Sequence, residues 1–179
     1  MNVVLIGYRA CGKSTVGKLL AEKLNFIFLD TDSLIEDKAA ISIKEIIANH
    51  GWDYFRAREK EVVQKLALKN KCVIATGGGV VLDEDNVNLL KKIGLIIWLN
   101  TPLADIIKRL SEDAEKDGVR PQFTNYNLAE ETAMVLKERI PLYQKAADFV
   151  LDTSEKGIEQ VMEEIFYYLR KSGISATGE

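Results

Sequence analysis

The stretch that decides the fold is Gly7-Tyr8-Arg9-Ala10-Cys11-Gly12-Lys13-Ser14, which follows the apolar run Asn2-Val3-Val4-Leu5-Ile6. The eight residues match GxxxxGK(S/T), in which glycines let the backbone curl until its N–H groups point at phosphate oxygens. The lysine of this pattern reaches the β- and γ-phosphates, and its hydroxyl residue is a ligand of Mg²⁺. Apolar residues at helical spacing follow, so the motif stands at a helix N-terminus, which favours an anion. The order strand, loop, helix therefore predicts a phosphate-binding loop rather than a merely structural glycine turn.

Length and composition are those of one globular domain. The chain has 179 residues, and a domain of this size buries roughly 70% of its unfolded surface. With 24 basic and 27 acidic residues and no basic block, a nucleic-acid partner is not expected. No leader-like segment is seen and the apolar runs are too short to cross a bilayer, so we expect a cytoplasmic protein without a membrane partner. Cys11 and Cys72 lack metal-ligand spacing and are expected to be reduced thiols.

Five short apolar runs alternate with helical patterns along the chain. This alternation predicts an α/β fold, a three-layer α/β/α sandwich around a mainly parallel five-stranded sheet. The strands are expected at residues 3–6, 26–29, 72–75, 95–99 and 149–151. No repeat or linker is evident, so residues 1–171 are expected to form a single domain.

Local signals predict where several helices begin and end. Ser42 with Glu45 forms a capping box, and Thr101 followed by Pro102 is typical of an N-cap and a first helical position. The segment Asn49-His50-Gly51 predicts a helix end, followed by a long helix from about Trp52 to Lys69.

Two stretches depart from the alternation. Residues 111–126 are polar and charged, and they form a longer connection than is usual in a compact domain. A mobile lid is favoured over a disordered excursion, because Arg120 lies within this stretch and an enzyme acting on phosphates must exclude water. Residues 172–179 show no periodicity and are expected to form a flexible tail.

Two carboxylates, Asp30 and Asp32, come at the carboxyl end of the second predicted strand. Ligands of doubly wound sheets bind at this edge. In an extended segment the two side chains would point the same way, so that one faces Mg²⁺ and the other a substrate hydroxyl. The alternative is that Asp32 only caps the next helix, expected from Ser33 to Lys38.

The third predicted strand ends in Gly77-Gly78-Gly79, where motor ATPases and many GTPases would place a metal-binding aspartate. The guanine-reading motif is absent as well, because Asn70-Lys71-Cys72-Val73 lacks its aspartate. Bare backbone allows a ligand or another chain segment to approach closely, although a flexible turn is the alternative. The motif therefore favours neither a motor ATPase nor a GTPase.

Several arginines lie beside turns or prolines. Arg56 and Arg58 come early in the predicted long helix, Arg120 precedes Pro121, and Arg139 lies two residues before Pro141. Each of them alone is consistent with a solvated surface position. A converging set would bind an anionic acceptor, because the planar guanidinium suits carboxylate and phosphate.

With these pieces assembled, residues 3–169 resemble the shikimate kinase family. Its motifs occur in order: the phosphate loop, Asp-x-Asp at 30–32, Phe-Arg-x-x-Glu at 55–59, Gly-Gly-Gly at 77–79, Arg-Pro at 120–121 and Arg-x-Pro-Leu-Tyr at 139–143. The resemblance implies a P-loop kinase of the nucleoside-monophosphate-kinase type, with a lid at about 111–126. Two features depart from the family pattern: Ala10 replaces a frequent glycine, and the lid is acidic.

The resemblance also implies roles for individual residues. Lys13, Asp32 and Arg120 would be catalytic, and Ser14 and Asp30 would hold Mg²⁺. ATP would be bound by Gly7, Ala10, Cys11, Gly12, Lys13, Ser14, Thr15, Arg109 and Arg120. Shikimate would be held by Asp32, Arg56, Gly77, Gly78, Gly79 and Arg139.

The expected reaction is transfer of the γ-phosphoryl group of MgATP to the 3-hydroxyl of shikimate by a monomer. A related kinase for a sugar acid or a nucleoside monophosphate is one alternative, since it would share the loop and read another acceptor. A nucleotide-binding regulatory module without turnover is the other.

Overall fold

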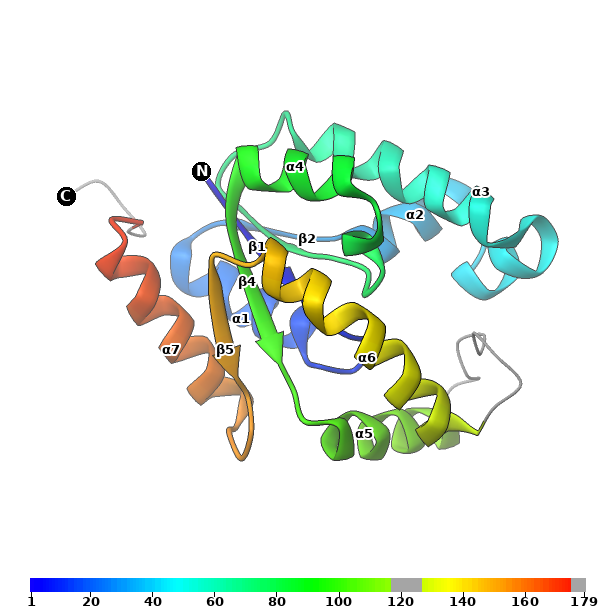
Figure 1. Ribbon diagram of the computed structural model, residues 1–179. Helices are drawn as coiled ribbons and strands as arrows, with labels where there is room; N and C mark the ends of the chain where they lie inside the picture. The colour runs from blue at the N-terminus through cyan, green and yellow to red at the C-terminus, as the bar shows by residue number, and fades with distance from the viewer. Residues whose placement is uncertain (117–126, 175–179) are drawn as a thin grey trace.

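The computed structural model describes residues 1–116 and 127–174, in which helices and strands alternate around one sheet (Figure 1). The strands are β1 (Asn2–Ile6), β2 (Ile27–Asp30), β3 (Cys72–Ala75), β4 (Gly94–Asn100) and β5 (Phe149–Asp152). The α-helices are α1 (Lys13–Leu24), α2 (Thr31–Ala39), α3 (Ile43–Leu66), α4 (Glu84–Ile93), α5 (Leu103–Lys116), α6 (Leu128–Ala146) and α7 (Ile158–Lys171), and η1 (Val80–Leu82) is a short 3₁₀ turn. Each predicted strand is confirmed, with shifts of one residue at some ends.

The sheet has the strand order β2-β3-β1-β4-β5, and every neighbouring pair is parallel. β1 lies at the centre, with Val4 opposite Ile74 of β3 and Ile96 of β4. All five residues of β1 are buried, which explains why the strand is a continuous apolar run rather than an alternating one. The carboxyl end of β1 therefore delivers the phosphate loop to the middle of one sheet edge.

Alternate residues of β1 supply two separate cores. Val4 and Ile6 pack with residues of α3, α4 and the end of α6, whereas Val3 and Leu5 pack with residues of α1 and α7. The two helical layers lie on opposite faces of the sheet (Figure 1). The predicted three-layer α/β/α sandwich with a parallel five-stranded sheet is thus confirmed. Among the described residues, no helix is long and apolar enough to span a membrane.

The structure confirms the helix ends predicted at Ser42 and Gly51 and corrects the one predicted at Thr101. Ser42 and Glu45 form both hydrogen bonds of the capping box at the start of α3, and Gly51 kinks this helix with φ 81° and ψ 174°. Before α5, however, the Pro102 carbonyl accepts the first helical bond from Ile106, so proline rather than Thr101 is the N-cap. The Thr101 hydroxyl instead bonds the Thr153 hydroxyl at 2.8 Å, a tertiary contact that local sequence does not encode.

Both predicted irregular stretches contain ordered residues. α5 continues to Lys116, so the predicted loop is helical over residues 111–116, and residues 117–126, with Arg120, lie outside the described residues. The predicted tail was wrong for residues 172–174. Gly173 turns the chain with φ 79°, and Ile174 donates a backbone hydrogen bond to Leu169 and buries its side chain beside α7. The other tail residues, 175–179, lie outside the described part of the chain.

Candidate active site

The phosphate loop joins β1 to the N-terminus of α1, as the sequence predicted. Gly12 is the residue before α1 and has φ 94°, a left-handed conformation that glycine adopts without steric cost. Ala10 also has a positive φ, of 60°. Glycine adopts this left-handed conformation more readily than alanine does. Having alanine at position 10, where the family often has glycine, therefore has a conformational cost. Ser14 and Thr15, in the first turn of α1, remain exposed.

Lys13 is folded back over the loop that it follows. Its Nζ donates hydrogen bonds to the carbonyls of Gly7 at 2.9 Å and Tyr8 at 2.7 Å, and lies 3.5 Å from the Cys11 sulfur. The lysine is only 8% exposed. This ammonium is thus held at the concave loop, where a phosphate would exchange for carbonyl partners. Cys11 is itself buried beneath the loop.

Ser14 and Asp30 form the second polar group of the loop region. The Ser14 hydroxyl donates a hydrogen bond of 2.6 Å to Oδ2 of Asp30, while Oδ1 of Asp30 accepts from the backbone N–H groups of Asp32 and Ser33. Mg²⁺ prefers oxygen ligands, is bound through one or two carboxylates and retains waters and substrate phosphates. A hydroxyl and a carboxylate side by side fit that requirement at the loop.

The structure decides between the two interpretations of the aspartate pair. Asp30, not Asp32, is the N-cap of α2, and the helix begins at Thr31 rather than at Ser33. The prediction that the two side chains point the same way along an extended segment is therefore wrong, because Asp32 already belongs to the helix. Asp30 faces Ser14, whereas Asp32 lines a pocket on the other side of the loop.

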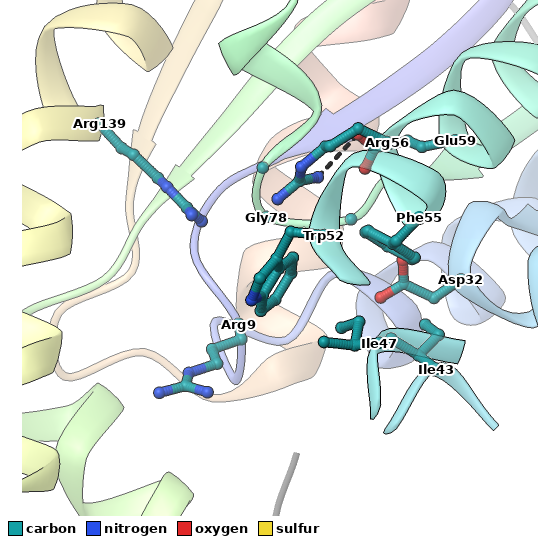
Figure 2. Close-up of a pocket in the computed structure, with 12 residues that line it drawn as sticks. Arg9, Asp32, Ile43, Ile47, Trp52, Phe55, Arg56, Glu59, Gly78 and Arg139 are labelled. Carbon is teal, nitrogen blue, oxygen red and sulfur yellow. Dashed lines mark hydrogen bonds and ion pairs between the residues drawn. The ribbon is translucent and has the colours of Figure 1, made fainter. Parts of the chain in front are cut away.

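That pocket, called here the acceptor pocket, lies between the phosphate loop, α3, the glycine segment after β3, and α6 (Figure 2). Ile43, Ile47, Trp52 and Phe55 form its apolar wall. Charged groups from the phosphate loop, α2, α3 and α6 complete the lining: Arg9, Asp32, Arg56, Glu59 and Arg139. Apolar walls with a few convergent charges are typical of a site for a small polar ligand.

The three glycines form the floor of the acceptor pocket because side chains cover them closely. A Cβ atom on Gly77 would lie 2.7 Å from Oδ1 of Asp32 and 2.9 Å from Oε1 of Glu59, and one on Gly79 would lie 2.1 Å from the Arg56 guanidinium. The backbone N–H of Gly77 donates to the hydroxyl of the buried Thr31 at 2.9 Å. Other parts of the chain thus approach this glycine backbone closely, which is one of the two possibilities that the sequence left open.

Arg56 is held by a buried carboxylate. Its Nη1 lies 2.7 Å from Oε2 of Glu59, which is inaccessible to solvent. Burial raises the pKa of Glu59, while the charge and hydrogen bond of Arg56 oppose the rise; Asp32 adds to it and Arg139 opposes it. In the sequence, Glu59 stands out only as the last residue of the Phe-Arg-x-x-Glu motif, and no role was predicted for it. Its spacing of three residues from Arg56 on one helix was the available signal.

Helix α6 contributes the opposite wall. Arg139 is 7% exposed and lines the pocket, as the sequence predicted. Tyr143, one turn later, donates a 2.5 Å hydrogen bond to the Gly78 carbonyl and stacks on Trp98. Burial raises the pKa of Tyr143 far above its usual range, so its hydroxyl remains a donor. This tyrosine thereby fastens α6 to the glycine segment.

A second pocket lies beyond the other side of the loop. It is lined by residues of α5 and of the segment after β5: Asp105, Lys108, Arg109, Glu112, Thr153, Glu155, Lys156 and Gly157. Arg109 donates from Nη1 to the Ala10 carbonyl at 3.2 Å, which places it at the rim of the phosphate loop. The second pocket is thus linked to the phosphate loop through Arg109.

Other arginines do not behave as the sequence suggested. Arg58, two residues after Arg56, pairs with Glu61 on the surface at 2.8 Å and does not line the acceptor pocket. Arg9, which occupies a variable position of the loop motif, does line it and was not predicted. Helical periodicity would have separated Arg56 from Arg58, but nothing in the loop pattern marks Arg9.

A phosphate loop with an adjoining pocket, on a parallel sheet of this strand order, defines a P-loop kinase of small molecules. A model of the shikimate kinase family matches residues 9–170. The chain is 38% identical to shikimate kinase of Syntrophus aciditrophicus (92% of this chain, 88% of that protein) and 40% identical to shikimate kinase 2 of Yersinia enterocolitica (94% and 95%). The structure of shikimate kinase from Acinetobacter baumannii in complex with shikimate superposes with a TM-score of 0.88 at 32% identity, covering 96% of this chain and 93% of that one. The chain belongs to the shikimate kinase family.

Proposed function

We propose that this protein transfers the γ-phosphoryl group of MgATP to the 3-hydroxyl of shikimate, giving shikimate 3-phosphate for aromatic amino-acid biosynthesis. The observation that carries the proposal is the acceptor pocket beside the phosphate loop, where Asp32 lies with Arg56 and Arg139. A carboxylate acceptor suits the two guanidinium groups, and its hydroxyl groups suit the aspartate. Membership of the family supports the same substrate.

Phosphoryl transfer needs positioning and neutralisation of charge more than covalent chemistry. The N–H groups of residues 7–15, in the loop and the first turn of α1, would bind the phosphates, and Lys13 would leave its carbonyl partners for the transferring group. Ser14 and Asp30 would hold Mg²⁺, which supplies charge neutralisation at the β- and γ-phosphates when bound. Arg120, outside the described residues, is proposed as a further cation at the transferring phosphate.

Asp32 is proposed to orient the 3-hydroxyl and to accept its proton. It is the second residue of α2, after the Asp30 cap and Thr31, and its carboxylate lies over Gly77 at the base of the pocket. A base must come within hydrogen-bond reach of the proton that it removes. The Gly78 and Gly79 backbone, Arg56 and Arg139 would hold the remaining groups of shikimate.

The nucleoside would occupy the second pocket, where the Arg109 side chain bonds the loop backbone. A planar guanidinium there can stack on a base. The arrangement supports nucleotide on one side of the loop and acceptor on the other, with the phosphoryl group passing between them. Residues 1–171 are proposed to act as one kinase domain with a closing lid.

We further propose a monomeric, cytoplasmic enzyme. The use of MgATP, a cytoplasmic co-substrate, supports the proposed location. Sedimentation at several protein concentrations tests the monomer.

Turnover with an acceptor panel tests the proposed reaction. Purified protein with MgATP should consume nucleotide with shikimate and not with sugar acids or nucleoside monophosphates. Consumption with another acceptor only would indicate a related kinase, and nucleotide binding without any acceptor-dependent turnover would indicate a regulatory module.

A further inference from the structure

Arg9 of the phosphate loop forms an ion pair with the first turn of α6. Its Nη2 lies 2.9 Å from Oε1 of Glu131, across 122 residues of sequence. Both side chains are removed from water: Glu131 is fully buried and the Arg9 side chain is 9% exposed. In Figure 2 the guanidinium of Arg9 points away from Trp52, although the residue itself lines the acceptor pocket. The buried pair therefore ties the phosphate loop to α6.

Tyr8, the preceding residue, extends this contact into a small apolar cluster. The cluster consists of Tyr8, Ile106 of α5, and Val135 and Leu136 of α6, all of them buried. The guanidinium groups of Arg9 and Arg139 lie 5.6 and 5.9 Å from the centre of the Tyr8 ring. Glu131, Val135 and Arg139 are spaced four residues apart, so they form neighbouring positions along one side of α6.

The same loop residues also abut the other wall of the acceptor pocket. A Cβ atom on Gly78 would lie 3.3 Å from the backbone nitrogen of Arg9 and 3.4 Å from the Gly7 carbonyl. Gly78 in turn accepts the hydrogen bond of Tyr143 from α6. The loop, the glycine segment and α6 are thus each in contact with the other two.

We propose that Arg9 and Glu131 are a positioning pair for phosphoryl transfer. They hold α6, and with it the acceptor-binding Arg139, at a set distance from the phosphate loop. The pair acts through Arg139 and the loop backbone and does not itself bind the nucleotide. The inference rests on the proposed function, because it assigns the pair to the alignment of shikimate with the γ-phosphoryl group.

Two physical arguments favour this role over simple stabilisation. Burying an ion pair removes both charges from water, and the attraction gained often does no more than offset that cost. A pair of this kind instead favours one geometry, since any shift of α6 would separate two opposite charges that are buried together. Displacing reacting groups by about 1 Å can cost about 100-fold in rate, so small movements of α6 would be visible in turnover.

The test compares four variants with the wild type: Glu131→Gln, Arg9→Met, the double variant, and Arg9→Lys. Steady-state kinetics give kcat and KM for shikimate, equilibrium titration gives the Kd for MgATP, and melting curves report folding. We expect each of the first two variants to lower kcat/KM for shikimate by about 10- to 100-fold, with the Kd for MgATP changed by no more than about twofold. The double variant should lose little more than either single one, because a pair that acts as a unit is not additive. Arg9→Lys should lower kcat/KM less than Arg9→Met does, because lysine retains the positive charge.

Thr132→Val is the matched control. Thr132 is the next residue of α6, is fully buried, and its hydroxyl has no hydrogen-bond partner in the described structure. This change alters a buried polar atom beside Glu131 and leaves the ion pair intact, so kcat/KM should remain that of the wild type.

Three results would overturn the inference. One is a loss in Arg9→Met with none in Glu131→Gln, which would mean that Arg9 acts alone. Another is a lower melting temperature with unchanged kcat/KM at a temperature where the variants are folded, which would make the pair structural only. The third is full additivity in the double variant. If Glu131→Gln does not fold, wild-type kcat/KM in folded Arg9→Met decides against the pair. Wild-type turnover with shikimate tests the proposed function separately from all of these.

Discussion

Replacing Glu59 by glutamine should weaken binding of the acceptor, because it removes the charge that holds Arg56 over the glycine segment. The Arg56 guanidinium lies 2.7 Å from the Glu59 carboxylate and close against Gly79, where a Cβ atom would force the guanidinium to move. Glutamine has nearly the same shape and can still accept one hydrogen bond. The change therefore removes charge and leaves the volume of the pocket intact.

The magnitude follows from the burial of the two partners. A hydrogen bond to a charged group contributes about 1.5–3 kcal/mol, and 1.4 kcal/mol corresponds to a tenfold change in affinity. Glu59 is inaccessible, but the Arg56 side chain is 26% exposed, so solvent screens part of the interaction. We expect the lower part of the range, a rise of about 10- to 30-fold in KM for shikimate, with a much smaller change in KM for ATP.

The pH dependence provides a second measurement on the same variant. Because burial raises the pKa of Glu59, its protonation, which discharges the pair, begins at a higher pH than for an ordinary glutamate. Shikimate affinity of the wild type should fall as the pH decreases through this raised pKa. The pH profile of Glu59→Gln should lack this fall on the acid side. The stability of the fold should depend on pH in the opposite direction. An acid whose pKa is raised in the folded state makes the protein less stable as the pH rises from its unfolded pKa through the folded one.

The assay is initial-rate kinetics with both substrates varied between pH 5 and 8, with melting curves at each pH as the folding control. Arg58→Gln is a matched control, because it removes a surface charge from the same helix, and it should leave both KM values unchanged. A wild-type KM for shikimate in Glu59→Gln, or an unaltered acid limb, would refute the role of Glu59.

Three further predictions concern the loop, the aspartates and α6. Lys13→Ala should abolish turnover while retaining the melting behaviour of a folded protein, and wild-type kcat would contradict the loop assignment. Asp30→Asn should raise the Mg²⁺ concentration needed for half-maximal rate but keep the α2 cap, since asparagine caps as well as aspartate; Asp32→Asn should lower kcat by about 10²–10⁴-fold at saturating Mg²⁺. Full recovery of kcat in Asp32→Asn on adding Mg²⁺ would overturn the assignment of Asp32 to the acceptor. Arg139→Ala should weaken shikimate binding by about 1.5–3 kcal/mol and ATP binding far less, and an unchanged KM for shikimate would remove Arg139 from the site.

The sequence by itself determined the architecture and the chemistry of the phosphate loop. The loop motif depends on residues next to one another, and the strands are continuous apolar runs, so both are encoded locally and were predicted correctly. The capping box of Ser42 and the kink at Gly51 are local in the same sense. Arg139 was favoured by its position before Pro141 and Arg56 was assigned by the resemblance to the family, and the structure brings both to one pocket.

Only the tertiary structure decided which partner each polar group has. The division of Asp30 and Asp32 between the loop and the acceptor pocket depends on where α2 begins, and Thr101 lost its predicted capping role to a contact with Thr153. The pair of Arg9 with Glu131 joins residues 122 positions apart. Separating such a pair is costly because both charges are buried inside the protein. Which groups are buried together is a property of the packed fold and has no signature in a local stretch of sequence.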